Sequence, residues 1–212
     1  MNRVYLAAVL AVGVATPAVA QFAGMPVWNS PKGGTGITIS GDYGKPNADA
    51  GKGNAFGARG TVGLGSLSLT AGFSTWKPSG ATNSLKSIGG DAAFRVIGGS
   101  LLPINLNLLV GGARTTVSGA SGNLTTLIAG GGVSVSLPTP GVTVEPYVSV
   151  ANRWHKPSGG STDSNIGWTI GANLGFGMLG AHIAYDSESL GGGTTAGVLG
   201  VGLHLALNVP MM

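Results

Sequence analysis

Apolar and small polar residues alternate with a period of two along almost the whole chain. The alternation is clearest in residues 66–75, where Leu67, Leu69 and Phe73 are separated by Ser, Thr and Gly. This period places the two sets on opposite faces of a β-strand, whereas a helix needs apolar residues every three or four positions. The pattern predicts an all-β chain of ten strands, over residues 35–43, 55–64, 66–75, 88–97, 104–113, 125–137, 142–154, 165–176, 179–187 and 195–208.

The connectors between these strands alternate between short and long. Short connectors are expected at residue 65, 98–102, 138–141 and 177–178, and long ones at 44–54, 76–87, 114–124, 155–164 and 188–194. Short turns at one end and long loops at the other are typical of an up-and-down antiparallel transmembrane β-barrel. Ten strands are the favoured number, and eight are the alternative.

The polar faces of the strands distinguish a membrane barrel from a soluble sandwich, whose water-facing side normally carries lysine. All six lysines lie outside the predicted strands, at Lys32, Lys45, Lys52, Lys77, Lys86 and Lys156. Parity places a nearly balanced set of charges on the polar faces, a lumenal charge network of Asp42, Arg59, Asp91, Arg95, Glu145, Arg153, His182 and Asp186, with His204 beside it. Such balance fits a closed lumen in which charges must be paired. A soluble lipocalin-like carrier would need an apolar lumen instead.

Aromatic residues are expected on the apolar face near the long-loop ends. They are Tyr43, Phe56, Phe73, Trp154, Trp168 and Tyr185, and they predict an aromatic girdle at the membrane–water boundary. A related echo is YGKPN (43–47), WKPSG (76–80) and WHKPSG (154–159). We interpret each as a strand end, where the lysine meets head-group phosphate or water and the proline stops the strand. Trp76 is the exception, because it has lumenal parity.

The N-terminus has the features of a secretory signal peptide. Arg3 precedes an apolar run over residues 4–15, and Ala-Val-Ala at 18–20 matches a cleavage site. The predicted organisation is a cleaved signal peptide at 1–20, a periplasmic N-terminal segment at 21–34 and a barrel at 35–209. The chain has no cysteine, which excludes a disulfide framework and lipid anchoring at a cysteine.

Together, the signal peptide, the ten alternating strands, the unequal connectors and the aromatic strand ends resemble the bacterial outer-membrane β-barrel superfamily, from Thr35 to Asn208. The resemblance implies a porin-like monomer in the outer membrane of a Gram-negative cell. It also implies that outer-membrane lipid, lipopolysaccharide and the barrel-assembly machinery are partners. Such proteins often end in an aromatic residue, whereas this chain ends in NVPMM.

No motif predicts catalysis. The candidate pairs are His155 with Asp163, and His182 with Asp186 or Glu188, but their spacing matches no hydrolase motif. No cofactor or metal ligand spacing occurs, and there is no basic run for nucleic acid. We therefore expect a structural barrel or a very narrow pore with a polar, charge-paired lumen, and not an enzyme. The alternative is a surface-binding, adhesin-like protein that acts through its extracellular loops.

Extrapolating the register from the turn at Gly65 predicts one particular ion pair. Arg59 should lie opposite Gly72, and Gly72 opposite Asp91. Arg59 and Asp91 would then be two strands apart, at about 9–10 Å, with no side chain between them.

Overall fold

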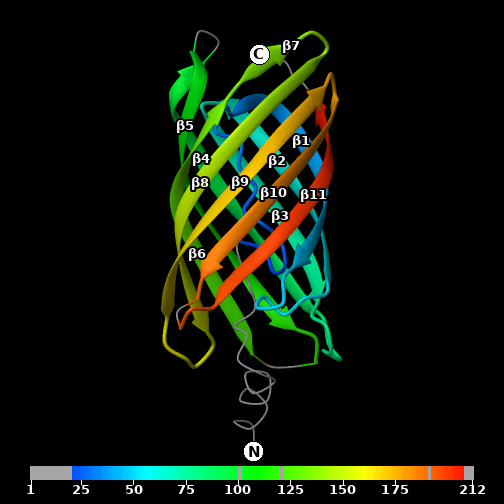
Figure 1. Cartoon of the computed structure of the whole chain (residues 1–212), viewed down its shortest axis with the longest axis vertical. Coiled ribbons are helices and arrows are strands. Elements are labelled where there is room, and N and C mark those ends of the chain that lie inside the picture. The colour runs from blue at the N-terminus through cyan, green and yellow to red at the C-terminus, as the bar shows by residue number, and fades with distance from the viewer. Residues whose placement is uncertain (1–20, 100–101, 120–121, 191, 208–212) are drawn as a thin grey trace, which may run out of the picture.

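Ten long antiparallel strands close into a barrel in the computed structural model of the 212-residue chain, which describes residues 21–99, 102–119, 122–190 and 192–207 (Figure 1). The strands are β1 (Gly34–Pro46), β2 (Asn54–Gly65), β3 (Leu67–Lys77), β4 (Leu85–Gly99), β5 (Leu102–Val117), β6 (Asn123–Val135), β8 (Val142–Pro157), β9 (Asp163–Phe176), β10 (Leu179–Ser189) and β11 (Thr195–Leu207). A three-residue strand, β7 (Leu137–Thr139), forms a small hairpin with the start of β8. β1 pairs with β11, which closes the sheet and confirms the predicted ten-strand barrel.

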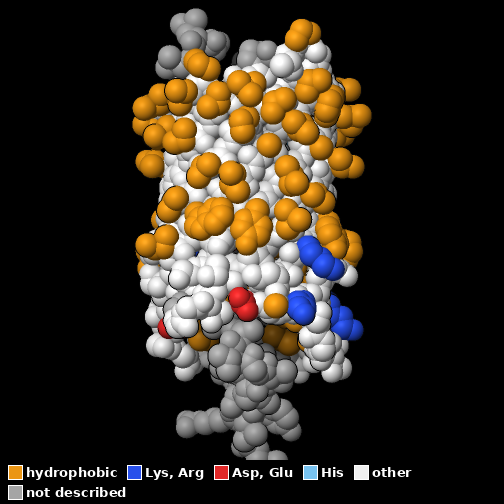
Figure 2. All heavy atoms as spheres, viewed as in Figure 1, with side chains coloured by type: hydrophobic (Ala, Val, Ile, Leu, Met, Phe, Trp, Pro, Cys, Tyr) orange, Lys and Arg blue, Asp and Glu red, His pale blue; other side chains and the backbone are white. Residues whose placement is uncertain are grey.

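Each strand turns its small polar residues inward and its apolar residues outward. In β8, Ser149 and Arg153 are buried while Val148 and Val150 are exposed. The exposed apolar side chains form a broad belt around the barrel (Figure 2). This is the arrangement of a membrane barrel, whose outer surface faces hydrocarbon and whose interior, here called the bore, is polar.

The strands extend further at the long-loop end than the sequence predicts. The loops there are residues 47–53, 78–84, 118–122, 158–162 and 190–194, at the bottom of Figure 1. The strands continue because backbone pairing persists beyond the apolar belt, where the outward residues become polar. As a correction, Lys45, Lys77, Lys86 and Lys156 therefore lie within strand ends, on the outer face.

Residues 21–33, here called the inner segment, run inside the barrel from the long-loop end toward the short-turn end, where β1 begins (Figure 1). The sequence predicted a periplasmic segment at 21–34, so the position of this segment is corrected. The physical reason is that a ten-strand barrel lined by Gly, Ser and Thr encloses more space than its own side chains fill. The predicted signal peptide at 1–20 and the NVPMM terminus lie outside the described residues.

The register confirms one half of the predicted ion pair and corrects the other. Arg59 lies opposite Gly72, as expected, but Gly72 lies opposite Gly89 instead of Asp91. The loop between β3 and β4 closes with Trp76 opposite Leu85, which is two residues tighter than predicted. A shift of two preserves which face each residue occupies, so Asp91 still points into the bore, where its carboxylate accepts from Gln21 and Arg59 pairs with Asp42 instead.

Candidate functional site

The bore holds the molecule's main concentration of charged and buried polar residues, and the inner segment contacts it at three levels. At the long-loop level, Phe22 and Met25 pack with Ala55, Trp76 and Ala113 in a buried apolar cluster. Trp76, with lumenal parity, is 1% exposed. The apolar cluster therefore holds the start of the inner segment at this end of the bore.

At the middle level, Trp28 of the inner segment lies against a charged cluster from the wall. Its ring packs edge-on to His182, with centroids 4.4 Å apart, and the guanidinium carbon of Arg59 lies 5.2 Å from the ring centroid of Trp28. Asp42 joins both wall residues, because its carboxylate accepts from Arg59 Nε at 3.0 Å and lies 2.6 Å from His182 Nε2. Trp28 thus packs against a compact Arg–Asp–His cluster in which Asp42 and His182 are buried and Arg59 is partly exposed.

At the short-turn level, amide and hydroxyl groups fasten the inner segment. The side-chain amides of Asn29 and Asn107 donate to each other at 3.2 and 2.7 Å. Ser30 Oγ donates to Glu145 Oε2 at 2.7 Å, and the backbone N–H of Lys32 donates to Oε1 of the same carboxylate at 2.8 Å. Glu145 is buried and also accepts from two side chains of the wall, so donors from the wall and from the inner segment together stabilise this carboxylate in the bore.

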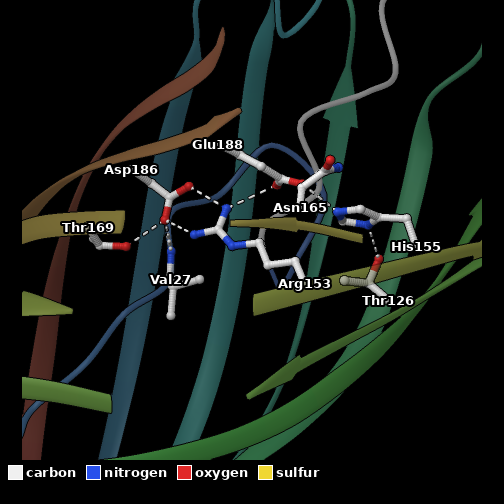
Figure 3. A network of polar contacts seen from close by, with 8 residues as sticks. All are labelled: Val27, Thr126, Arg153, His155, Asn165, Thr169, Asp186 and Glu188. Atoms are coloured by element: carbon white, nitrogen blue, oxygen red, sulfur yellow. Dashed lines mark hydrogen bonds and ion pairs between the residues drawn. The ribbon is translucent and has the colours of Figure 1, made fainter. Parts of the chain in front are cut away.

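A second charged cluster surrounds Arg153, whose side chain is 1% exposed (Figure 3). Its guanidinium donates to both oxygens of Asp186, at 2.8 and 2.7 Å, and to Glu188 at 3.1 Å. His155 Nε2 lies 2.6 Å from Glu188, and the backbone N–H of Val27 donates to Asp186 at 3.3 Å. Two carboxylates around one guanidinium, with the inner segment as a further donor, make a buried ion-paired network in which the Arg153 Nε alone has no hydrogen-bond partner.

The same cluster contains a hydroxyl, an imidazole and a carboxylate joined by hydrogen bonds, an arrangement that resembles a catalytic triad. Thr126 Oγ1 lies 3.1 Å from His155 Nδ1, whose other ring nitrogen contacts Glu188. Thr126, however, has no exposed surface, and a nucleophile must be reached by its substrate. In this conformation the arrangement is a buried hydrogen-bonded chain between strands.

Glycines on the inner face make room for the inner segment. A Cβ added at Gly200 would lie 2.6 Å from Pro26 Cγ and 2.9 Å from Trp28, and one at Gly57 would lie 3.2 Å from Met25 Cε. By contrast, a Cβ at Gly60, on the outer face, would meet no atom within 4 Å. Gly200 is therefore required by the close approach of the inner segment, whereas a Cβ at Gly57 would first meet the wall itself, at the Phe73 carbonyl.

The eight charged residues predicted for the lumen all lie on the inner face, but they form separate groups. Asp42, Arg59 and His182 form one group, with His204 3.2 Å from His182, and Arg153 with Asp186 forms another. The remaining three contact the inner segment or its end: Asp91 accepts from Gln21 at 2.9 Å, Glu145 binds Ser30 and Lys32, and Arg95 donates to the carbonyl of Lys32.

Sequence reasoning missed several residues of the bore. His155 and Glu188 belong to the Arg153 cluster, although they were placed in loops; continuing the alternation from Arg153 and from Asp186 would have found both. His155 does lie opposite Asp163, yet it contacts Glu188, and His182 pairs with Asp42 instead of Asp186. The inner segment's own contacts at Gln21, Trp28 and Asn29 had no periodic signal.

The six aromatic residues predicted for a girdle lie on the outer face. Phe56 and Phe73 are each 58% exposed, and Trp154, Trp168, Tyr185 and Tyr43 are partly exposed. Tyr43 packs beside Phe56, with ring centroids 5.4 Å apart, and Trp168 beside Tyr185, at 5.7 Å. All six belong to the half of the barrel nearer the long loops.

The described residues contain neither a membrane-spanning helix nor a candidate metal site. No helix there is long and apolar enough to cross a membrane. Within the same ranges, no group of three or more His, Cys, Asp or Glu side chains is arranged to hold a metal ion.

Sequence comparison finds no relative: no protein-family model matches the chain, and no curated protein matches it. Solved structures do match. The β domain of the Bordetella autotransporter BrkA aligns with 82% of this chain and 100% of its own, at 10% identity and a TM-score of 0.52. Neisserial surface protein A aligns over 82% and 98%, at 13% identity and 0.41. A bacterial polysaccharide outer membrane secretin aligns over 74% of this chain and 57% of its own, at 9% identity and 0.47. At these identities the likeness is one of fold.

Proposed function

The chain has the fold of the bacterial outer-membrane β-barrels, and we propose that in that membrane it is a structural barrel whose bore is closed by its own N-terminal segment. One observation carries the proposal: the inner segment, residues 21–33, occupies the bore and is fastened at each level of it. Phe22 and Met25 pack at the long-loop level, Trp28 in the middle and Asn29 at the short-turn level.

The energetics favour a bore that stays filled. Leaving the bore would remove the Val27 N–H from Asp186, and the donors of Ser30 and Lys32 from Glu145. Water could replace these donors, but the apolar contacts of Phe22 and Met25 would be lost as well. Burying an apolar side chain of that size stabilises by about 1.5–3 kcal/mol. The closed form is therefore the resting form in this proposal, and an open channel is not.

Planar-bilayer conductance tests the proposal. The chain that begins at Gln21 should be electrically silent, and a chain that begins at Gly34 should give discrete openings. A heat-dependent shift in gel mobility checks that both chains have folded. If the shortened chain does not fold, Gly200→Val replaces it, since the new side chain would collide with Pro26 and Trp28. Discrete openings from the chain beginning at Gln21 would contradict the proposal.

We propose no catalytic role for the bore. The Thr126–His155–Glu188 chain is the arrangement most like an active site, and the burial of Thr126 argues against it. Incubation of the folded barrel with ester, amide and phospholipid substrates should give no turnover. Turnover abolished by His155→Gln but preserved in His204→Gln would contradict this part of the proposal.

Surface binding through the loops is the second candidate function, and one feature favours it. A hollow of about 520 Å³ lies between the ends of β2 and β3 and the loop 78–84, and Asn54, Thr75 and Lys77 line part of it. Backbone bonds join this loop to its neighbour, since the Ser79 N–H donates to the Gly51 carbonyl at 3.0 Å. Ordered loops around a hollow can present a binding surface, and whole-cell binding assays with loop 78–84 replaced by Gly and Ser would test it.

A further inference from the structure

The repeated Lys–Pro pair of the sequence has a common position in the fold that the closed bore does not explain. Its lysines are Lys45, Lys77 and Lys156, which lie at the long-loop ends of β1, β3 and β8. All three side chains are exposed on the outer face. The repeat thus places an outward-facing positive charge at the same end of three different strands.

Two more cations fill the space between these lysines. Lys86 lies opposite Thr75 of β3 and opposite Thr116 of β5. It is therefore the diagonal neighbour of Lys77 on one side and of Arg114 on the other, and such neighbours are about 7–8 Å apart. Lys86 and Arg114 are both exposed, so the three charges form a connected group on the outer face.

The register also links this group to the two outer lysines. Lys45 Nζ donates to Asn54 Oδ1 at 3.0 Å, and Asn54 lies directly opposite Lys77. On the other side, Arg114 lies opposite Thr125, which lies opposite Lys156. Each of these links spans two strand spacings, about 9–10 Å. The result, here called the cationic arc, is a continuous row that consists of Lys45, Lys77, Lys86, Arg114 and Lys156.

The arc has no compensating acid on the outer face. Five of the seven acids of the chain point into the bore, and the other two, Asp49 and Asp163, lie in a loop and at a strand's first residue. In the described part of the chain, no arc residue forms an ion pair. Figure 2 shows Lys and Arg side chains beside the lower edge of the apolar belt, toward the long loops, with an Asp or Glu side chain exposed at the same level. β9, β10 and β11 contribute no cation to this rim.

We propose that the cationic arc binds the phosphate groups of anionic lipid head groups in the outer leaflet. The phosphorylated glycolipid of that leaflet is lipopolysaccharide. Long loops mark the outer side of such barrels, and the arc lies where the apolar belt ends and head groups begin. Lysine is a point-charge binder of phosphate. Asn54, Thr75, Thr116 and Thr125, exposed between the cations, add hydrogen-bonding groups. A row of charges about 7–10 Å apart suits a head group that carries more than one phosphate. The inference uses only the outer face and holds whether or not the bore conducts.

Binding of bisphosphorylated lipid A to the folded full-length barrel in neutral detergent micelles tests the proposal. The double variant Lys77→Gln/Lys86→Gln removes the centre of the arc. Its matched control, Lys32→Gln/Lys52→Gln, removes the same charge at exposed positions outside the arc. Each basic residue near an anionic surface contributes enough to change affinity about fivefold. We therefore expect binding to weaken at least tenfold in the arc variant and to stay within about twofold in the control.

Three further readouts make each outcome decisive. Added salt should weaken binding of the wild type, phosphatidylcholine should bind no better to the wild type than to the arc variant, and millimolar inorganic phosphate should not displace lipid A. Equal affinity of the two double variants would overturn the proposal, and displacement by inorganic phosphate would reassign the arc to free phosphate. If the arc variant fails the heat-dependent gel shift, Arg114→Gln/Lys156→Gln takes its place, with the same expected result.

Discussion

The inner and outer faces of the barrel wall are made by the same strands and follow different physical rules. On the inner face, charges are buried and paired, as in Arg153 with Asp186 and Glu188. On the outer face of the described strands, charge occurs only at the long-loop rim and forms no ion pair, as at Arg114. Inside the barrel, a charge is buried at nearly every position along a strand and therefore needs a hydrogen-bonding or ionic partner at each of them. On the outer face, the position along the strand determines whether a charge is tolerated, because the surroundings change from hydrocarbon to head groups.

The largest expected difference is between two arginines, one on each face. Arg153→Leu should lower the free energy of unfolding by about 3–5 kcal/mol, because it leaves Asp186 and Glu188 as buried charges without their partner. Arg114→Leu should change it by less than about 1 kcal/mol, since the exposed guanidinium has no ion pair to lose. Urea titration of both variants in lipid vesicles measures the difference. Equal losses would mean that the inner network contributes no more than a surface charge.

The second comparison stays on the outer face of one strand, β5. Leu108→Arg should destabilise the barrel by about 2–4 kcal/mol, because Leu108 lies in the apolar belt, while Thr116→Arg at the rim should cost about 0–1 kcal/mol. Leu108 is 57% exposed, and both residues point outward. The same urea titrations apply, and similar costs at the two depths would show that lipid does not cover the belt as assigned.

The smallest expected difference is between two glycines. Gly200→Val should cost about 1–3 kcal/mol, since the new side chain overpacks against Pro26 and Trp28. Gly60→Val, on the open outer face, should stay within about 0.5 kcal/mol. Thermal unfolding followed by gel mobility compares them. A cost for Gly60→Val that matches the cost for Gly200→Val would indicate that backbone strain, and not the inner segment, constrains these positions.

The number of strands and the face on which each side chain lies could both be predicted, because a period of two is visible within each short stretch of sequence. The register across the loop after β3 could not be predicted, because the length of a loop depends on where strand pairing stops. For this reason Arg59 was assigned to Asp91, whereas it pairs with Asp42. The rim was also misjudged: alternation continues through Lys45 and Lys86 with polar residues on the outer face, and no change in period marks the end of the lipid belt.

The inner segment had no signature of its own in the sequence. Residues 21–33 have neither a helical nor a strand period, and their contacts depend on the shape and the polar groups of a bore that forms only when the barrel closes. An indirect signal was available at Gly200, where the missing side chain leaves room that the inner segment fills. Other inner-face glycines, such as Gly72 and Gly89, are approached only by neighbouring strands, so glycine alone does not identify an inserted segment.

The central claim, that the inner segment fills the bore, can be measured directly because the chain contains no cysteine. A single Val27→Cys variant places a thiol at a position that is 1% exposed within the bore, and Ser79→Cys places one on an exposed loop. Both are treated with a small, charged maleimide in the folded state and again after heating. The account predicts that Cys at Ser79 reacts in both states and Cys at Val27 only after heating. Equal reaction rates of the two thiols in the folded barrel would contradict this account and would show that residues 21–33 lie in water outside the bore.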